Sequence, residues 1–260
     1  MTQAIRVVKN PMMHNNGDEY LTDIIGISFL VSGLIEIALP LVFAFILIKR
    51  LHTGWKTWFI GAMMFLLSLI RIPLNTFLTN IAVSGTINYI TYLLVYLIPS
   101  LTAGIFEESA RYIGLKYLIK DESYENGLTY GAGHGGIESI FLVGINVFTL
   151  GIILLTSPES LPQMQLYSIQ STPWYLPLVG AYERIMAMII QISLSIMVLE
   201  ALRTKQIKYL GIAILAHTAV NYLSASAVSY SVLYAELVVT GFAIGLGQWA
   251  YTKVKDSLKV

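Results

Sequence analysis

Seven apolar stretches long enough to cross a bilayer take up most of this chain, and lysine and arginine follow only every second one. Inside a bilayer such a stretch satisfies its backbone hydrogen bonds only as a helix. Hydrophobic residues make up 56% of the sequence and the mean hydropathy is +0.69, well outside the soluble range. We therefore predict an all-α, polytopic transmembrane helical bundle. The expected spans are residues 21–48, 57–81, 88–119, 125–155, 174–202, 208–224 and 229–251.

The positions of the basic residues predict how the bundle is oriented. Lysine and arginine gather after spans one, three, five and seven, whereas the loops around Ser84, Ser160 and Ala227 carry neither. Because basic loops stay on the cytoplasmic side, we predict an integral protein of the plasma membrane with its N-terminus outside and its C-terminus cytoplasmic. An eighth span is expected only if the 156–173 segment or the N-terminal arm partly enters the bilayer.

Three regions follow from this division, and composition excludes several kinds of function. We expect a polar N-terminal arm (1–20), a transmembrane catalytic bundle (21–252) and a short basic cytoplasmic tail (253–260). A net charge of +1 without a basic cluster argues against nucleic acid as a partner. The chain has no cysteine, so it lacks a thiol nucleophile, thiolate metal ligands and disulfides. Its chemistry must use carboxylates, histidines, hydroxyls or amides.

Ionisable residues inside the spans are the best candidates for function, because charges in lipid are costly. Glu107, His134 and His217 stand on three different spans. Counted from the predicted cytoplasmic end of each span at about 1.5 Å per residue, all three lie roughly 14 to 18 Å deep. We therefore expect the three side chains to meet at one level of the bundle.

Helical spacing adds further residues to this group. Arg111 stands three and four residues after Glu108 and Glu107, so it shares a helix face with them and can hold one carboxylate ionised while the other acts as a base. Asn221 follows His217 by one turn. The glycines around His134 would let another helix or an extended substrate approach closely, and helix packing is the favoured reading. They are Gly131, Gly133, Gly135 and Gly136.

Structural readings of the same charges stay open. The pair formed by Glu108 and Arg111 is as consistent with a purely structural ion pair as with a catalytic role. Glu183 and Arg184 are read as a buried brace, with Glu183 a minor site candidate. Glu36 and Arg71 are expected to pair with each other.

In order, these motifs resemble those of the CAAX-protease and bacteriocin-processing (CPBP/Abi) superfamily of intramembrane proteases: Glu-Glu-Ser-Ala-Arg at 107–111, a membrane histidine at His134, and His-Thr-Ala-Val-Asn at 217–221. The Gly-His-Gly-Gly-Ile-Glu segment at 133–138 and Tyr-Glu-Arg at 182–184 resemble its YhfC branch of intramembrane metalloproteases more specifically. The arginine stands one residue closer to the acids than in the commonest form of the first motif, so a prenylated substrate is not assumed.

The resemblance implies an intramembrane endopeptidase that cuts a peptide or membrane-protein substrate near the cytoplasmic leaflet, with the lipid bilayer as its other partner. Glu107 would activate water with help from His134, Glu108 and Arg111 would orient the base, and His217 and Asn221 would bind a metal or stabilise the oxyanion. Glu107, His134 and His217 suffice for a zinc ion with one open position, and equally for a base and oxyanion clamp without metal.

Two other functions remain as alternatives. A proton- or cation-coupled membrane transporter also uses buried carboxylates and histidines, although the lack of an internal repeat counts against it. A non-catalytic bacteriocin-immunity or binding protein could use the same scaffold.

Overall fold

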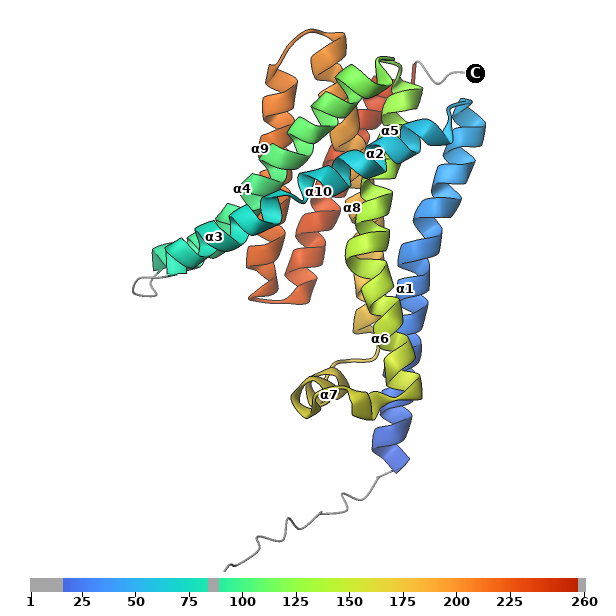
Figure 1. Cartoon of the computed structure of the whole chain (residues 1–260), viewed down its shortest axis with the longest axis vertical. Helices are drawn as coiled ribbons and strands as arrows, with labels where there is room; N and C mark the ends of the chain where they lie inside the picture. The colour runs from blue at the N-terminus through green and yellow to red at the C-terminus, as the bar shows by residue number, and fades with distance from the viewer. Residues whose placement is uncertain (1–15, 84–88, 257–260) are drawn as a thin grey trace, which may run out of the picture.

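The structure is a computed structural model that describes residues 16–83 and 89–256, and every regular element within these ranges is a helix (Figure 1). Seven helical segments are long and apolar enough to cross a membrane. They are Tyr20–Leu51, Trp55–Val83, Ile90–Ile119, Tyr124–Thr156, Leu176–Arg203, Lys208–Val228 and Val232–Val254. The predicted bundle of seven spans is therefore confirmed, with each boundary within four residues of its predicted place.

Several spans are composite. The elements are α1 (Asn16–Leu51), α2 (Trp55–Ser68), α3 (Arg71–Val83), α4 (Tyr89–Ile113), the π-helix η1 (Gly114–Ile119), α5 (Tyr124–Glu138), the π-helix η2 (Ser139–Gly144), α6 (Ile145–Thr156), the 3-10 helix η3 (Pro158–Ser160), α7 (Gln163–Gln170), α8 (Leu176–Arg203), α9 (Lys208–Val228) and α10 (Val232–Val254). The 156–173 segment holds only η3 and α7. Eight residues of α-helix measure about 12 Å, too short to cross a bilayer. The predicted N-terminal arm lies mostly outside the described residues.

The second span is broken where α2 passes into α3. Pro73 has no N–H to give to the carbonyl of Leu69, four residues earlier, and its ring clashes with that carbonyl. The N–H of Ile72 bonds that oxygen instead, at 2.9 Å. The break places Arg71 at the first position of α3.

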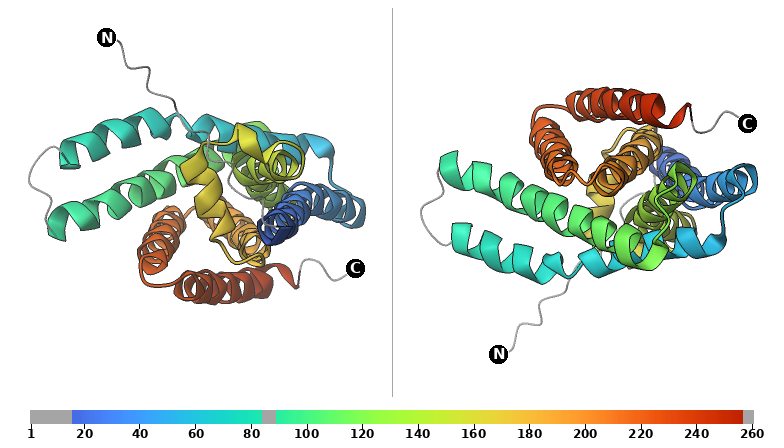
Figure 2. Two further views of the ribbon diagram at one scale, coloured as in Figure 1. Left: turned by 90° about the horizontal axis from the view of Figure 1, so that it is seen from below. Right: turned by 90° about the horizontal axis from the view of Figure 1, so that it is seen from above.

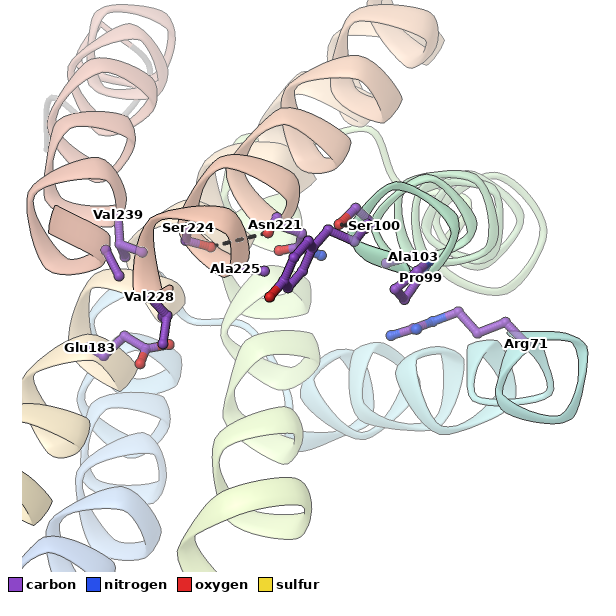
Figure 3. A pocket seen from close by; sticks show the side chains of 12 residues that line it. Arg71, Pro99, Ser100, Ala103, Glu183, Asn221, Ser224, Ala225, Val228 and Val239 are labelled. Carbon is purple, nitrogen blue, oxygen red and sulfur yellow. Dashed lines mark hydrogen bonds between the residues drawn. The ribbon is translucent and has the colours of Figure 1, made fainter. Parts of the chain in front are cut away.

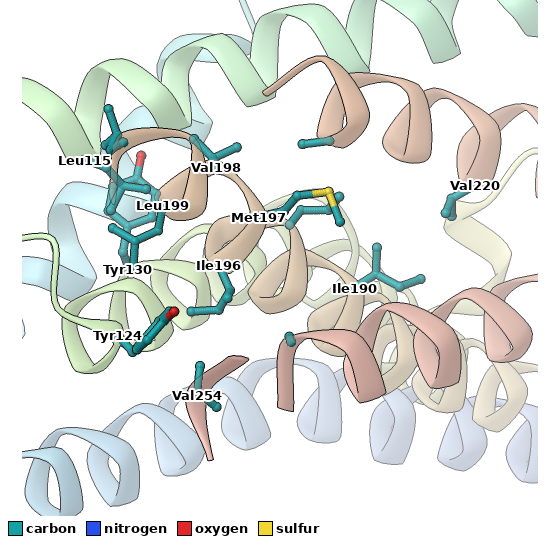
Figure 4. Packing of buried hydrophobic residues seen from close by; sticks show 14 of the residues in the cluster. Leu115, Tyr124, Tyr130, Ile190, Ile196, Met197, Val198, Leu199, Val220 and Val254 are labelled. Carbon is teal, nitrogen blue, oxygen red and sulfur yellow. The ribbon is translucent and has the colours of Figure 1, made fainter. Parts of the chain in front are cut away.

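The helix α8 is the centre of the bundle and packs against α1, α5, α9 and α10 (Figure 2). Its apolar side chains, such as Leu194, Ile196 and Leu199, are almost fully buried and belong to one hydrophobic cluster with Tyr130 of α5 and Val220 of α9 (Figure 4). Helices α3 and α4 pack side by side, and the C-terminal end of α3 and the N-terminal end of α4 project from the bundle. Polar residues of α8 therefore reach the interior that α4, α5 and α9 also face.

Glycines bring α2 and α5 into backbone contact. A Cβ added to Gly133 would lie 2.0 Å from the carbonyl oxygen of Trp58, and one added to Gly61 would lie 2.2 Å from that of Tyr130. The expected helix-packing role is thus what this face of α5 shows, and it leaves no room there for a substrate. The contact fixes the position of His134, the residue after Gly133.

The basic ends of the spans gather at one end of the bundle (Figure 1). Arg203 at the end of α8 donates to the main-chain oxygen of Glu122, and Lys253 near the end of α10 lies 3.4 Å from Glu200. The short helix α7 lies at the opposite end. The spans are therefore arranged as the depth comparison assumed.

Candidate functional site

The two acids of α4 point to different neighbours, because adjacent helical residues are about 100° apart around the axis. Glu107 faces α3 and α5. Its Oε1 accepts a hydrogen bond of 2.9 Å from Arg71 Nη2, and its Oε2 lies 3.3 Å from His134 Nε2 and 3.8 Å from His217 Nε2. Glu107 is 2% exposed and His134 is fully buried. The predicted meeting of Glu107, His134 and His217 is therefore observed.

Glu108 faces α9 and holds the second histidine. Its Oε1 lies 2.7 Å from His217 Nδ1, and its Oε2 lies 3.4 Å from Arg111 Nε. A neutral His217 that donates from Nδ1 to this carboxylate presents an unprotonated Nε2 toward Glu107. The ring thus lies between the two acids, with its orientation set by Glu108.

Arg111 is held by α8 as well as by Glu108. Its Nη1 donates to the main-chain oxygen of Gln191 at 2.5 Å and to Ser195 Oγ at 3.0 Å, and its Nη2 donates to Gln191 Oε1 at 2.6 Å. Gln191 Nε2 in turn donates to Glu138 Oε2 at 2.6 Å and lies 3.5 Å from Glu107 Oε2. The side-chain amide of Gln191 therefore connects Arg111 with two carboxylates, those of Glu138 and Glu107.

Sequence reasoning missed Gln191 and gave Arg71 the wrong partner. Arg71 bonds Glu107, whereas Glu36 of α1 accepts from Ser32 of its own helix at 3.0 Å. The predicted pairing of Glu36 with Arg71 is therefore wrong. The signal for Arg71 was visible, since it is a charge in an apolar span. An uncharged amide such as Gln191 gives a weaker one.

The brace predicted on α8 extends to α5. Arg184 pairs with the neighbouring Glu183 and also lies 3.5 Å from Glu138 Oε1. Through Glu138 and Gln191 this pair is linked to the site. Glu183 is the more exposed of the two acids and lines a pocket.

A pocket of about 390 Å³ is lined by Arg71, the residue that bonds Glu107 (Figure 3). Its walls come from the parts of α4 that precede Glu107 and of α9 that follow His217, closed by α10. Arg71 and Asn221 both line it. The structure gives no hydrogen bond from the Asn221 side chain to the other described site residues, so this predicted member faces the pocket rather than the histidines.

The residues as arranged do not fit the predicted zinc site. Among the described residues, no group of three or more histidine, aspartate or glutamate side chains has the geometry to hold a metal ion. The guanidinium of Arg71 occupies Glu107 Oε1, and a fixed cation at that carboxylate opposes a second one by Coulomb repulsion. Glu107, His134 and His217 therefore converge without forming a three-ligand centre.

Comparison with known proteins places the chain. A family profile described as YhfC intramembrane metalloprotease matches residues 35–243. The chain belongs to the YhfC family. It is 30% identical over 209 residues to a protein of Bacillus subtilis (strain 168) named uncharacterized membrane protein YhfC, and the match covers 74% of this chain and 80% of that relative. No solved structure matches the chain. The family's description supports a protease that uses a metal, at the level of the family.

Proposed function

We propose that this protein is an intramembrane endopeptidase that hydrolyses a peptide bond in a peptide or membrane-protein substrate. The observation that carries the proposal is the placement of Glu107 Oε2 opposite two imidazole nitrogens, deep inside a bundle of seven spans. A carboxylate in this setting can take a proton from water, and the family's description agrees with hydrolysis. Membership of the wider CAAX-protease and bacteriocin-processing superfamily remains part of this proposal.

The reaction uses the chain's own residues. Glu107 accepts a proton from a water molecule, whose oxygen attacks the carbonyl carbon while the carbonyl electron pair moves onto oxygen. The C–N bond then breaks, and the amine leaves with the proton returned by Glu107. His134 and the Nε2 of His217 orient the water, and Glu108 fixes the His217 ring. Arg111 and Gln191 hold Glu108 and Glu107 in place.

Metal, membrane and partners belong to the same proposal. The family's description implies a metal ion, and zinc, our prediction for it, would require Glu107, His134 and His217 to rearrange from the positions described above. We place the protein in the plasma membrane, with its basic loops and C-terminus in the cytoplasm, and take the lipid bilayer and the substrate as its partners.

Glu107→Gln tests the proposal, because it removes the base and keeps the volume. Purified wild type and variant are reconstituted into proteoliposomes with detergent-extracted membrane proteins of the expression host, and new N-termini are mapped by mass spectrometry. Wild type should generate N-termini that are absent with Glu107→Gln. Identical sets of N-termini would refute the proposal. Proton or cation flux into these vesicles would then favour a transporter, and partner protection that survives Glu107→Gln would favour a binding or immunity protein.

A further inference from the structure

Arg71 lies where the proposed base and the pocket meet. Its Nη2 donates to Glu107 Oε1 at 2.9 Å, and the same side chain lines the pocket between α4 and α9. Figure 3 shows it extending from the start of α3 beneath Pro99 and Ala103 of α4. A group held in this pocket can therefore touch a residue that also touches Glu107.

The guanidinium has donors to spare. Arginine carries five N–H groups, and one of them bonds Glu107. Its Nε is buried and has no hydrogen-bond partner among the described residues. Because the Arg71 side chain lines the pocket and is 15% exposed, its other N–H groups can meet an acceptor that is held there. The side-chain amide of Asn221 lines the same pocket.

We propose that Arg71 is a catalytic residue that binds the carbonyl oxygen of the scissile peptide bond. This inference rests on the proposed function. As the water oxygen bonds to the carbonyl carbon and the electron pair moves onto the carbonyl oxygen, negative charge develops beside a fixed cation in a site of low dielectric. Because one guanidinium contacts both base and carbonyl, the water between them is held in line for attack.

The other walls of the pocket suit a peptide main chain. Between Arg71 and Glu183 they are mainly small or uncharged, including Ser100, Ala103, Ser224 and Ala225. Such walls leave room for a backbone and offer no competing cation. The pocket extends from Arg71 toward the end of the bundle opposite the basic loops, so a substrate segment held in it comes from the half of the membrane that we predict to be outer.

The test uses a synthetic peptide that spans the cleavage site mapped with wild type in proteoliposomes, together with two uncleavable analogues. In one analogue the scissile carbonyl is reduced to CH₂, and in the other a phosphinate places an anionic oxygen at that point. The variants are Arg71→Met and Arg71→Lys, and Arg50→Met is the control because Arg50 is an exposed arginine at the end of α1.

In Arg71→Met we expect kcat to fall about 100- to 1000-fold, as for loss of one oxyanion donor, with KM changed by less than about threefold. Phosphinate affinity should fall by about 100-fold or more, in parallel with kcat/KM. Affinity for the reduced analogue should stay at the wild-type value, which also shows that the variant is folded. Arg71→Lys keeps the charge, so its losses of kcat and of phosphinate affinity should be smaller than those of Arg71→Met. Arg50→Met should behave as wild type.

Four results would overturn the inference. If Arg71→Met lowers kcat but leaves phosphinate affinity unchanged, Arg71 only orients Glu107. If Arg71→Met and Arg71→Lys both lose affinity for both analogues, Arg71 only supports the fold. Wild type that cleaves while Arg71→Met cleaves equally well would refute this inference alone. Wild type that cleaves nothing would refute the proposed function and this inference with it.

Discussion

The contact between α2 and α5 predicts a large penalty for a single added methyl group at Gly133. An alanine Cβ there would stand 2.0 Å from the main-chain oxygen of Trp58, 2.8 Å from its carbonyl carbon and 3.0 Å from its Cα. Ordinary contact begins at 3.4 Å, so the two helices must separate by more than 1 Å. Backbone atoms cannot rotate out of the way as a flexible side chain can.

Gly241→Ala is the matched control. Gly241 lies near the middle of α10, and a Cβ added there meets nothing within 4 Å. The gain in helix propensity, about 1 kcal/mol, is common to both variants and cancels in the comparison. The difference in free energy of unfolding between them therefore isolates the packing cost. Overpacking costs about 1 to 3 kcal/mol, and we expect about 3 because the clash is with backbone.

The free energies are measured by unfolding the purified proteins in mixed detergent micelles with increasing sodium dodecyl sulfate, followed by circular dichroism. Gly133→Ala should be less stable than Gly241→Ala by about 3 kcal/mol. Because His134 is the next residue, Gly133→Ala should also lose most peptidase activity, whereas Gly241→Ala should keep it. A stability difference of less than about 0.5 kcal/mol would refute the reasoning, since it would show that the helices separate freely.

Two further predictions concern the charges of the site. Arg111→Met leaves Glu108 buried without its cation and should cost about 3 to 5 kcal/mol of unfolding free energy; adding Glu108→Gln should restore about 2 kcal/mol, and a double variant no more stable than Arg111→Met would contradict the pairing. Elemental analysis of wild type, His134→Ala and His217→Ala tests the metal. Near-stoichiometric zinc that is lost in both variants would make these histidines ligands after a rearrangement of the site. Folded wild type that takes up no added zinc would instead support water activation by Glu107 without a metal, with the two histidines serving the water and the oxyanion.

The sequence was sufficient for the spans and for the depth of the site, because both depend on quantities that run along the chain. Apolar length and the alternation of basic loops gave seven helices, and helical rise put Glu107, His134 and His217 at one level. Depth along a span does not say which residues face each other around the bundle axis. Depth alone left Arg71 free to pair with Glu36 or with Glu107, and only the packing of α3 beside α4 decides for Glu107.

The remaining gaps have physical causes of the same kind. Gln191 carries no charge, so nothing in its composition distinguishes it from a residue that merely faces another helix. Asn221 shares a helix with His217, yet it lines the pocket while the ring of His217 turns to Glu108. The sequence shows which residues have atoms that could bind zinc, but it does not show where those atoms point. That Arg71 already bonds Glu107 Oε1 is seen only in the structure.

The pairing of the acids of α4 also bears on how the chain is made. Glu108 has Arg111 one turn along its own helix, and Glu107 has Arg71 on the helix synthesised just before. Each carboxylate therefore has a positive partner when the hairpin of α3 and α4 leaves the ribosome, and the hairpin can enter lipid without an isolated charge. His217 follows Glu108 by 109 residues, so the reactive arrangement is completed only when α9 is inserted. A nascent chain that stalls before this helix would lack one of the two histidines of the proposed site.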